Sequence, residues 1–215
     1  MFDALEFDAA CTGDHRAAAQ QMSELAASGT QTDDFPRSEA FVRAGEQWLL
    51  ADEPAAAVTG FQRALAVEGE RQVGGGPALT DPRVPLARAL FMMERPAEAD
   101  TLIRQLEAEP GDPRICDLVA ELLVEQSDLP GALRWATAGV EMCLGQAGAG
   151  EAGSAVSAQA AADRAAALPA ADRAELQLLL RLRYRVRNDL GLPEDGYDSL
   201  LDGLDPEGAG AGDVD

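Results

Sequence analysis

The sequence predicts an all-α protein built from repeated pairs of antiparallel helices, an α-solenoid. Three observations lead to this prediction. Of the 215 residues, 47% are hydrophobic but only 5% are aromatic, and the β-branched residues that strands prefer are sparse. Apolar residues recur at the three- and four-residue spacing of a helix face. The same arrangement of two helices joined by a proline-marked turn then returns along the chain.

The clearest helix pair spans residues 38–71. In its first helix, Gly45 and Trp48 fall on one apolar stripe. Pro54 fits the first turn of the second helix, whose inner face carries Phe61. The remaining residues of the two stripes are Phe41, Ala44, Ala57 and Ala64. We expect the small residues to let the helices approach closely, while the aromatic rings of Trp48 and Phe61 fill the space between them.

The pattern recurs in four pairs, at about 2–33, 38–71, 80–113 and 113–144. Its key alanines are Ala18, Ala57, Ala99 and Ala132, which are 39, 42 and 33 residues apart. The longer spacings place loops around residues 31–34 and 72–79, where turn-forming residues gather. Pro96 and Pro130 again mark the second helix, whereas Pro85 is expected to shorten the first helix of the third pair.

The first helix of the clearest pair carries Phe41, Ala44, Gly45 and Trp48, and the second carries Ala57 and Phe61. This order of aromatic and small residues resembles the 34-residue tetratricopeptide repeat (TPR). The resemblance implies an α-solenoid that binds other proteins. The segments 132–135 and 185–193 are also similar to a group of actinobacterial TPR proteins that carry a SEC-C zinc motif. This chain lacks the clustered cysteines of that motif, so the similarity does not imply a zinc site. It implies only that the protein comes from a bacterium. The alternative is a generic alanine-rich helical bundle.

The composition changes after residue 144. Residues 145–169 read as a Gly/Ala-rich linker, in which 155–168 is either frayed helix or ordered loop. Residues 170–203 predict a long helix that caps the last repeat, stopped by a left-handed Gly191, and a short helix from about 193 to 201. The acidic tail, 204–215, is expected to be disordered.

Charge excludes several function classes. The chain has 17 basic residues, all arginine, against 38 acidic ones, for a net charge of −21. Such a chain repels phosphate backbones and anionic lipids, so we expect neither nucleic-acid nor membrane binding; adaptation to high salt is an alternative reading of the acidity. Three scattered cysteines and no leader-like or membrane-spanning segment predict a cytoplasmic protein.

No segment predicts an active site. Gly148, Gly150 and Gly153 match the dinucleotide fingerprint, but no strand precedes them, which favours a flexible linker. His15 lies beside Asp14 without a nucleophile at a matching spacing. Acidic pairs on helix faces are ordinarily solvated. We therefore expect a non-enzymatic protein without cofactor or metal.

Four arginines at positions 181, 183, 185 and 187 cannot form one binding stripe, because alternate members point to different sides of the helix. Two interpretations are favoured over binding of an external anion. The arginines favour the negative end of the helix dipole, or they pair with Asp195, Asp198 or the tail.

The predicted function is that of an interaction scaffold or adaptor with a partner segment in the concave groove. On the first helix of each of the last three pairs, the groove is formed by the stripe next to the one that packs into the core. The residues of these three stripes are Glu39, Val42, Glu46, Leu49, Asp81, Val84, Arg88, Phe91, Arg114, Asp117, Glu121 and Val124. These stripes hold apolar residues with more acid than base, so we expect a protein or peptide partner with basic and apolar residues. The alternatives are a ligand sensor or enzyme that uses the Gly/Ala-rich region, a structural homo-oligomer, and a groove filled by the chain's own loops.

Overall fold

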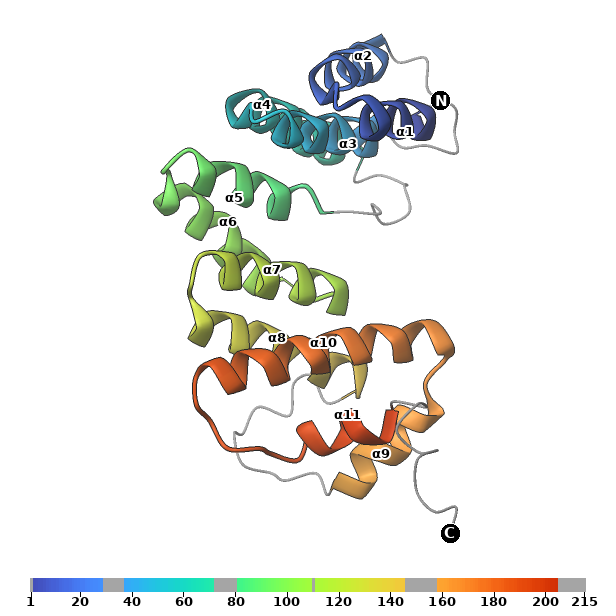
Figure 1. The fold of residues 1–215 in the computed structure, drawn as a ribbon, viewed down its shortest axis with the longest axis vertical. Coiled ribbons are helices and arrows are strands. Elements are labelled where there is room, and N and C mark those ends of the chain that lie inside the picture. The colour runs from blue at the N-terminus through green and yellow to red at the C-terminus, as the bar shows by residue number, and fades with distance from the viewer. Residues whose placement is uncertain (1, 29–36, 72–80, 110, 146–157, 205–215) are drawn as a thin grey trace. The chain divides into compact units, whose positions relative to one another are not determined.

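The computed structural model describes residues 2–28, 37–71, 81–109, 111–145 and 158–204, which form α-helices and no strand (Figure 1). The helices are α1 (Phe2–Thr12), α2 (His15–Ser28), α3 (Arg37–Leu50), α4 (Pro54–Arg71), α5 (Arg83–Met92), α6 (Pro96–Glu107), α7 (Pro113–Glu125), α8 (Leu129–Cys143), α9 (Ala158–Ala167), α10 (Ala170–Asp189) and α11 (Asp198–Leu204). The prediction of an all-α chain is confirmed for these residues. The glycine run that matches the dinucleotide fingerprint and the tail from residue 205 onward lie outside them.

The helices form two compact units, Met1–Glu109 and Pro110–Asp215. In the first unit each helix packs against the next from α1 to α6, and α3 also contacts α5. In the second unit α7 pairs with α8, α10 packs against both, and α11 contacts α9 and α10. The predicted repeat region, 1–144, therefore contributes its last helix pair to the second unit, where α10 covers it.

The turns after α3, α5 and α7 share one geometry. Each contains a left-handed residue, Asp52 (φ 59°), Glu94 (φ 57°) or Ser127 (φ 62°). The next backbone N–H donates to a carbonyl five residues earlier in each case, Glu53 to Trp48, Arg95 to Leu90 and Asp128 to Leu123, all at 2.9 Å. This is the Schellman arrangement that ends a helix. The same turn thus closes the first helix of three successive pairs.

Proline marks the start of the second helix, as predicted. Pro54 and Pro96 are the first residues of α4 and α6, and Pro130 is the second residue of α8. The expectation that Pro85 shortens the first helix of the third pair agrees with the structure, since α5 begins only at Arg83 and has 10 residues, against 14 in α3 and 13 in α7. Pro85 lies in the first turn of α5, where a backbone N–H has no partner within the helix.

The core of the first unit centres on the crossing of α3 and α4. Phe61 is fully buried, and its ring lies directly against Gly45, where a Cβ would come within 2.7 Å of the Phe61 Cζ. The four key alanines are all buried, with exposures between 0% and 6%. Trp48 is buried less completely than Phe61. The expectation that aromatic rings fill the space between the two helices is confirmed for Phe61.

The second unit is closed by α10. Its buried residues include Leu176, Leu179 and Val186, and Leu179 lies against Gly139 of α8. The helix ends as predicted at a left-handed Gly191 (φ 66°). Its capping bond runs from the Leu192 N–H to the Arg187 carbonyl at 3.0 Å, the same closure as in the three repeat turns. Residues 158–167 form a helix, α9, rather than an ordered loop.

Two arginines of α10 are held by two aspartates of the segment that follows. Arg183 is 5% exposed in its side chain and donates to Asp195 and Asp198, 3.0 and 3.2 Å away. Arg187 lies 3.0 Å from Asp195 and 3.2 Å from Asp198. We call these four residues the Arg183 clasp. The pairing interpretation is confirmed for Arg183 and Arg187.

The clasp also fixes where α11 begins. The Asp195 backbone N–H donates to the Asp198 side chain at 2.8 Å, and the Asp195 side chain accepts from the Tyr197 N–H at 3.0 Å. These bonds hold residues 193–197 in a turn, because the aspartate side chains replace helical partners. The short helix expected from 193 to 201 is therefore Asp198–Leu204 instead.

Candidate partner-binding surfaces

Of the four residues in the predicted groove stripe of α3, two are buried in the core and two are accessible at the surface. Val42 is 1% exposed and Glu39 is 6% exposed, so both side chains lie within the first unit. Glu46 is exposed and Leu49 is partly exposed. A partner could thus reach the C-terminal half of this stripe directly. Packing by α2, α4 and α5 on several sides of α3 explains why its N-terminal half is covered.

The predicted stripe of α5 divides in a similar way. Asp81 is engaged at the start of the helix, where its carboxylate accepts from the Arg83 backbone at 2.9 Å and from the Arg83 side chain at 2.7 Å. Val84 is 4% exposed and belongs to the core. Arg88 and Phe91 are partly exposed. The accessible residues of this stripe are therefore one cationic and one aromatic side chain.

A cluster of carboxylates joins α1 and α3 around Arg43, a residue that the sequence analysis did not single out. The Arg43 guanidinium lies 2.6 Å from Asp3, 3.5 Å from Glu6 and 3.5 Å from Glu39. Glu46 follows Glu39 by two helical turns on the same side of α3. We call Arg43 and these four acids the Arg43 cluster. The sequence hides it because α1 and α3 are separated by α2.

Electrostatics show that acid is in excess in this cluster. Burial raises the pKa of Glu39 above its usual value, despite the lowering effect of Arg43. The pKa of Glu46 is raised by desolvation first and then by repulsion from Glu39 and Glu6. The Oε2 atom of Glu39 is buried and has no hydrogen-bond partner among the described residues. An added cation would relieve this repulsion, because opposite charge favours the ionised carboxylates.

The last predicted stripe belongs to the second unit. Arg114 and Glu121 are exposed, and Asp117 and Val124 of α7 are partly exposed. Burial, Glu121 and Glu175 of α10 together raise the pKa of Asp117 to about 6. This face is therefore acidic as well. The structure brings these residues to one side of α7, beside α10.

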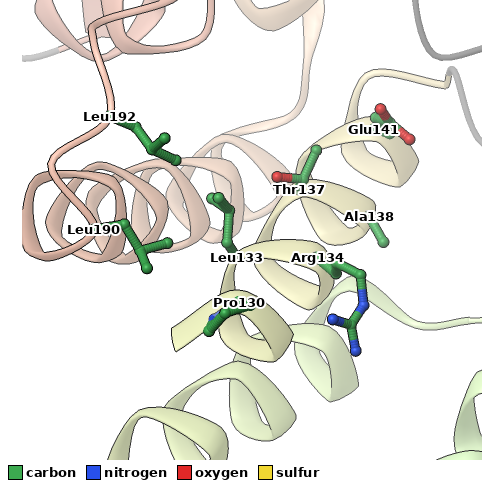
Figure 2. A pocket seen from close by; sticks show the side chains of 8 residues that line it. All are labelled: Pro130, Leu133, Arg134, Thr137, Ala138, Glu141, Leu190 and Leu192. Atoms are coloured by element: carbon green, nitrogen blue, oxygen red, sulfur yellow. The ribbon is translucent and has the colours of Figure 1, made fainter. Parts of the chain in front are cut away.

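Sequence reasoning missed a cleft of about 570 Å³ in the second unit, between α8 and the end of α10 (Figure 2). Its lining residues are Pro130, Leu133, Arg134, Thr137, Ala138, Glu141, Leu190 and Leu192. Figure 2 shows Leu190 and Leu192 facing Leu133 across the cleft. A signal was present: Leu133 and Leu192 are apolar but fall outside the packed stripes.

The residues considered for catalysis remain without a catalytic arrangement in the described part of the chain. His15 Nδ1 lies 2.9 Å from the Gln47 Oε1, an amide rather than an acid or nucleophile. Cys116 and Cys143 have pKa values raised to about 12 and about 11, chiefly by burial, so their thiols stay protonated. Within the described residues, no group of three or more His, Cys, Asp or Glu side chains could hold a metal ion.

Comparisons with known proteins give no family for this chain. Neither the protein-family models nor the curated proteins contain a match to it. None of the helices in the described ranges combines the length and the hydrophobicity that a membrane span requires.

Proposed function

We propose that this protein is a non-enzymatic interaction scaffold of the tetratricopeptide-repeat type, which acts in the bacterial cytoplasm and binds a segment of a partner protein. Its partner segment carries arginine or lysine beside apolar residues. The segment lies along the accessible parts of the first helices of the repeats, and in the first unit these are α1, α3 and α5.

Support for a solenoid of repeats comes from the turns. One Schellman geometry recurs at Asp52, Glu94 and Ser127, and each turn leads into a proline-marked second helix. Gly191 repeats the geometry after α10 and is followed by Pro193. In this proposal α10 is the first helix of a fifth, modified repeat, and it covers the fourth pair as a capping helix does.

One observation carries the binding proposal: three carboxylates lie within 3.5 Å of the Arg43 guanidinium, and a fourth, Glu46, follows on the same side of α3 at the edge of an accessible apolar stripe. Glu46 is the exposed member, and Leu49 follows it by one turn. A buried acceptor without a partner, such as the Glu39 Oε2, is a cost that proteins normally avoid. A cationic side chain of a partner would reduce the repulsion that raises the pKa of Glu46.

The same chemistry excludes other occupants. TPR domains that clamp a partner's C-terminal carboxylate use lysine and asparagine, and this chain has no lysine and a single asparagine, Asn188, on α10. An acidic segment would add to the repulsion in the Arg43 cluster. Leu49 and Phe91 supply apolar contact, while the carboxylates set partner choice and the rate of association.

The test is selection of binding peptides from a random display library on the purified protein. We expect selected peptides to be rich in Arg or Lys next to aliphatic residues. Glu46→Gln should weaken their binding about tenfold, the effect of removing roughly one charge-assisted contact. Phe91→Ala should also weaken binding, through faster dissociation.

Glu24→Gln is the matched control, because Glu24 is an exposed acid on α2 outside the Arg43 cluster. It should leave the affinity unchanged. Selection of peptides without basic residues, or equal effects of Glu24→Gln and Glu46→Gln, would contradict the proposed binding surface.

A further inference from the structure

We propose that the second unit also pairs with a second copy of the chain, through the outward face of α8, about a two-fold axis between Thr137 and Ala138. This surface lies on α8 and the end of α10 and shares no residue with the proposed partner-binding surface. The proposal therefore does not depend on the peptide-binding function.

The first argument is the charge pattern of α8. Arg134 and Glu141 both line the cleft and are seven residues apart, about 10 Å along the helix and on the same side of it (Figure 2). Neither forms an ion pair with another described residue; the Glu141 carboxylate acts instead on Tyr197, whose pKa burial and then Glu141 raise. Each would gain an opposite charge from a suitably placed partner.

A second copy supplies both charges at once. When two α8 helices lie antiparallel about a two-fold axis at their midpoint, Arg134 of one copy faces Glu141 of the other, and the reverse pair forms by symmetry. Thr137 and Ala138 stand at the midpoint. The Thr137 Oγ1 accepts from the Arg183 Nε at 3.1 Å, so Thr137 is held toward α10, and the small side chain of Ala138 lets the helix axes approach closely. A uniformly basic or uniformly acidic partner would satisfy only one of the two charges.

The surrounding surface also suits a copy of this chain. Leu133, Leu190 and Leu192 give the cleft an apolar wall, and Leu192 is 40% exposed although it is a large hydrophobic residue. Burying it removes apolar surface from water. The net charge of −21 opposes self-association over most of the surface. The residues that line the cleft include one acid and one base, so the facing pairs are opposite in charge when two copies meet here.

The experiment measures the oligomeric state by sedimentation velocity from low to high micromolar concentration. The wild-type protein should form a dimer. Arg134→Glu and Glu141→Arg should each weaken the dimer at least about tenfold, because like charges then face each other twice. The double variant, R134E/E141R, should restore it. An equimolar mixture of the two single variants should form a mixed dimer, because every facing pair is then opposite in charge.

Arg104→Glu is the matched control: Arg104 is an exposed arginine on α6, and the change in net charge equals that of Arg134→Glu. It should leave the dimer intact. Circular dichroism establishes that each variant is folded. A wild-type protein that stays monomeric over the whole range would overturn the proposal, as would a dimer that both single variants leave unchanged. Failure of the double variant and of the mixture to associate would overturn the two-fold arrangement.

Discussion

Replacing Gly45 by alanine tests the packing of the first unit most directly. A Cβ at this position would lie 2.7 Å from the Phe61 Cζ and 2.8 Å from its Cδ1. Carbon atoms in contact are normally about 3.5–4.0 Å apart. The ring would therefore have to move by about 1 Å. It has little room to do so, because Phe61 is fully buried and the backbones of α3 and α4 meet at Gly45 and Gly60.

Two opposing effects set the size of the change. Alanine favours the helix over glycine by about 1 kcal/mol. Overpacking a core by one methyl group costs about 1–3 kcal/mol, and the enclosed ring places Gly45→Ala at the upper end of that range. We expect a net loss of about 2 kcal/mol in the free energy of unfolding of the first unit. For a unit of this size, that lowers Tm by roughly 10 °C.

Urea unfolding followed by tryptophan fluorescence measures this loss. The chain has two tryptophans, Trp48 in the first unit and Trp135 in the second, so a Trp135→Phe background makes the signal specific to the first unit. Phe61→Leu should recover part of the loss in the double variant, because it removes the colliding ring edge. Gly203→Ala is the control: a Cβ there meets nothing within 4 Å. If Gly45→Ala proved as stable as the parent, the close approach of α3 and α4 at this point would be refuted.

Two further predictions concern the second unit. Because the pKa of Asp117 is raised to about 6, the folded state holds its proton more tightly than the unfolded state, so the contribution of Asp117 to stability is lost as pH rises from about 4 to 6. Asp117→Asn should raise stability at pH 7 by roughly 1 kcal/mol. Thermal unfolding of both proteins between pH 4.5 and 8 checks this: if the variant and the wild type show the same dependence of Tm on pH, the pKa of Asp117 is not raised. At pH 8, a disulfide reagent should modify the exposed Cys11 quickly and Cys116 and Cys143 slowly, and rapid loss of all three thiols would contradict the burial of α7 against α8.

The sequence predicted the helix pairs because their signals are local. Spacing on one helix and a proline at a helix start, as at Pro54 and Pro96, depend on neighbouring residues only. The burial of Val42 and Val84 could not be read in this way. A stripe beside the packed one looks exposed when each helix pair is considered alone, but α3 and α5 are also covered by helices of adjacent pairs.

The surfaces depend still more on distant contacts. The Arg43 cluster joins residues about 40 positions apart, since Arg43 bonds Asp3. The cleft on α8 requires the turn at Gly191 to bring Leu192 over a helix that ends nearly 50 residues earlier. The sequence suggested the ion pairs of the Arg183 clasp, because the arginines and aspartates are oppositely charged and close in sequence. It did not predict that Arg183 and Asp198 are buried, which distinguishes the clasp from a surface ion pair.

The Arg183 clasp gives the end of the second unit a temperature response of its own. Taking arginine and aspartate side chains out of water is opposed by their hydration, and that hydration becomes less favourable on heating. The leucine packing beneath α10 follows the hydrophobic effect, which weakens on cooling and levels off at high temperature. The attachment of α11 through Asp195 and Asp198 therefore tightens on warming, relative to the rest of the unit. On heating, α11 is thus expected to stay attached at least as long as the leucine packing beneath α10.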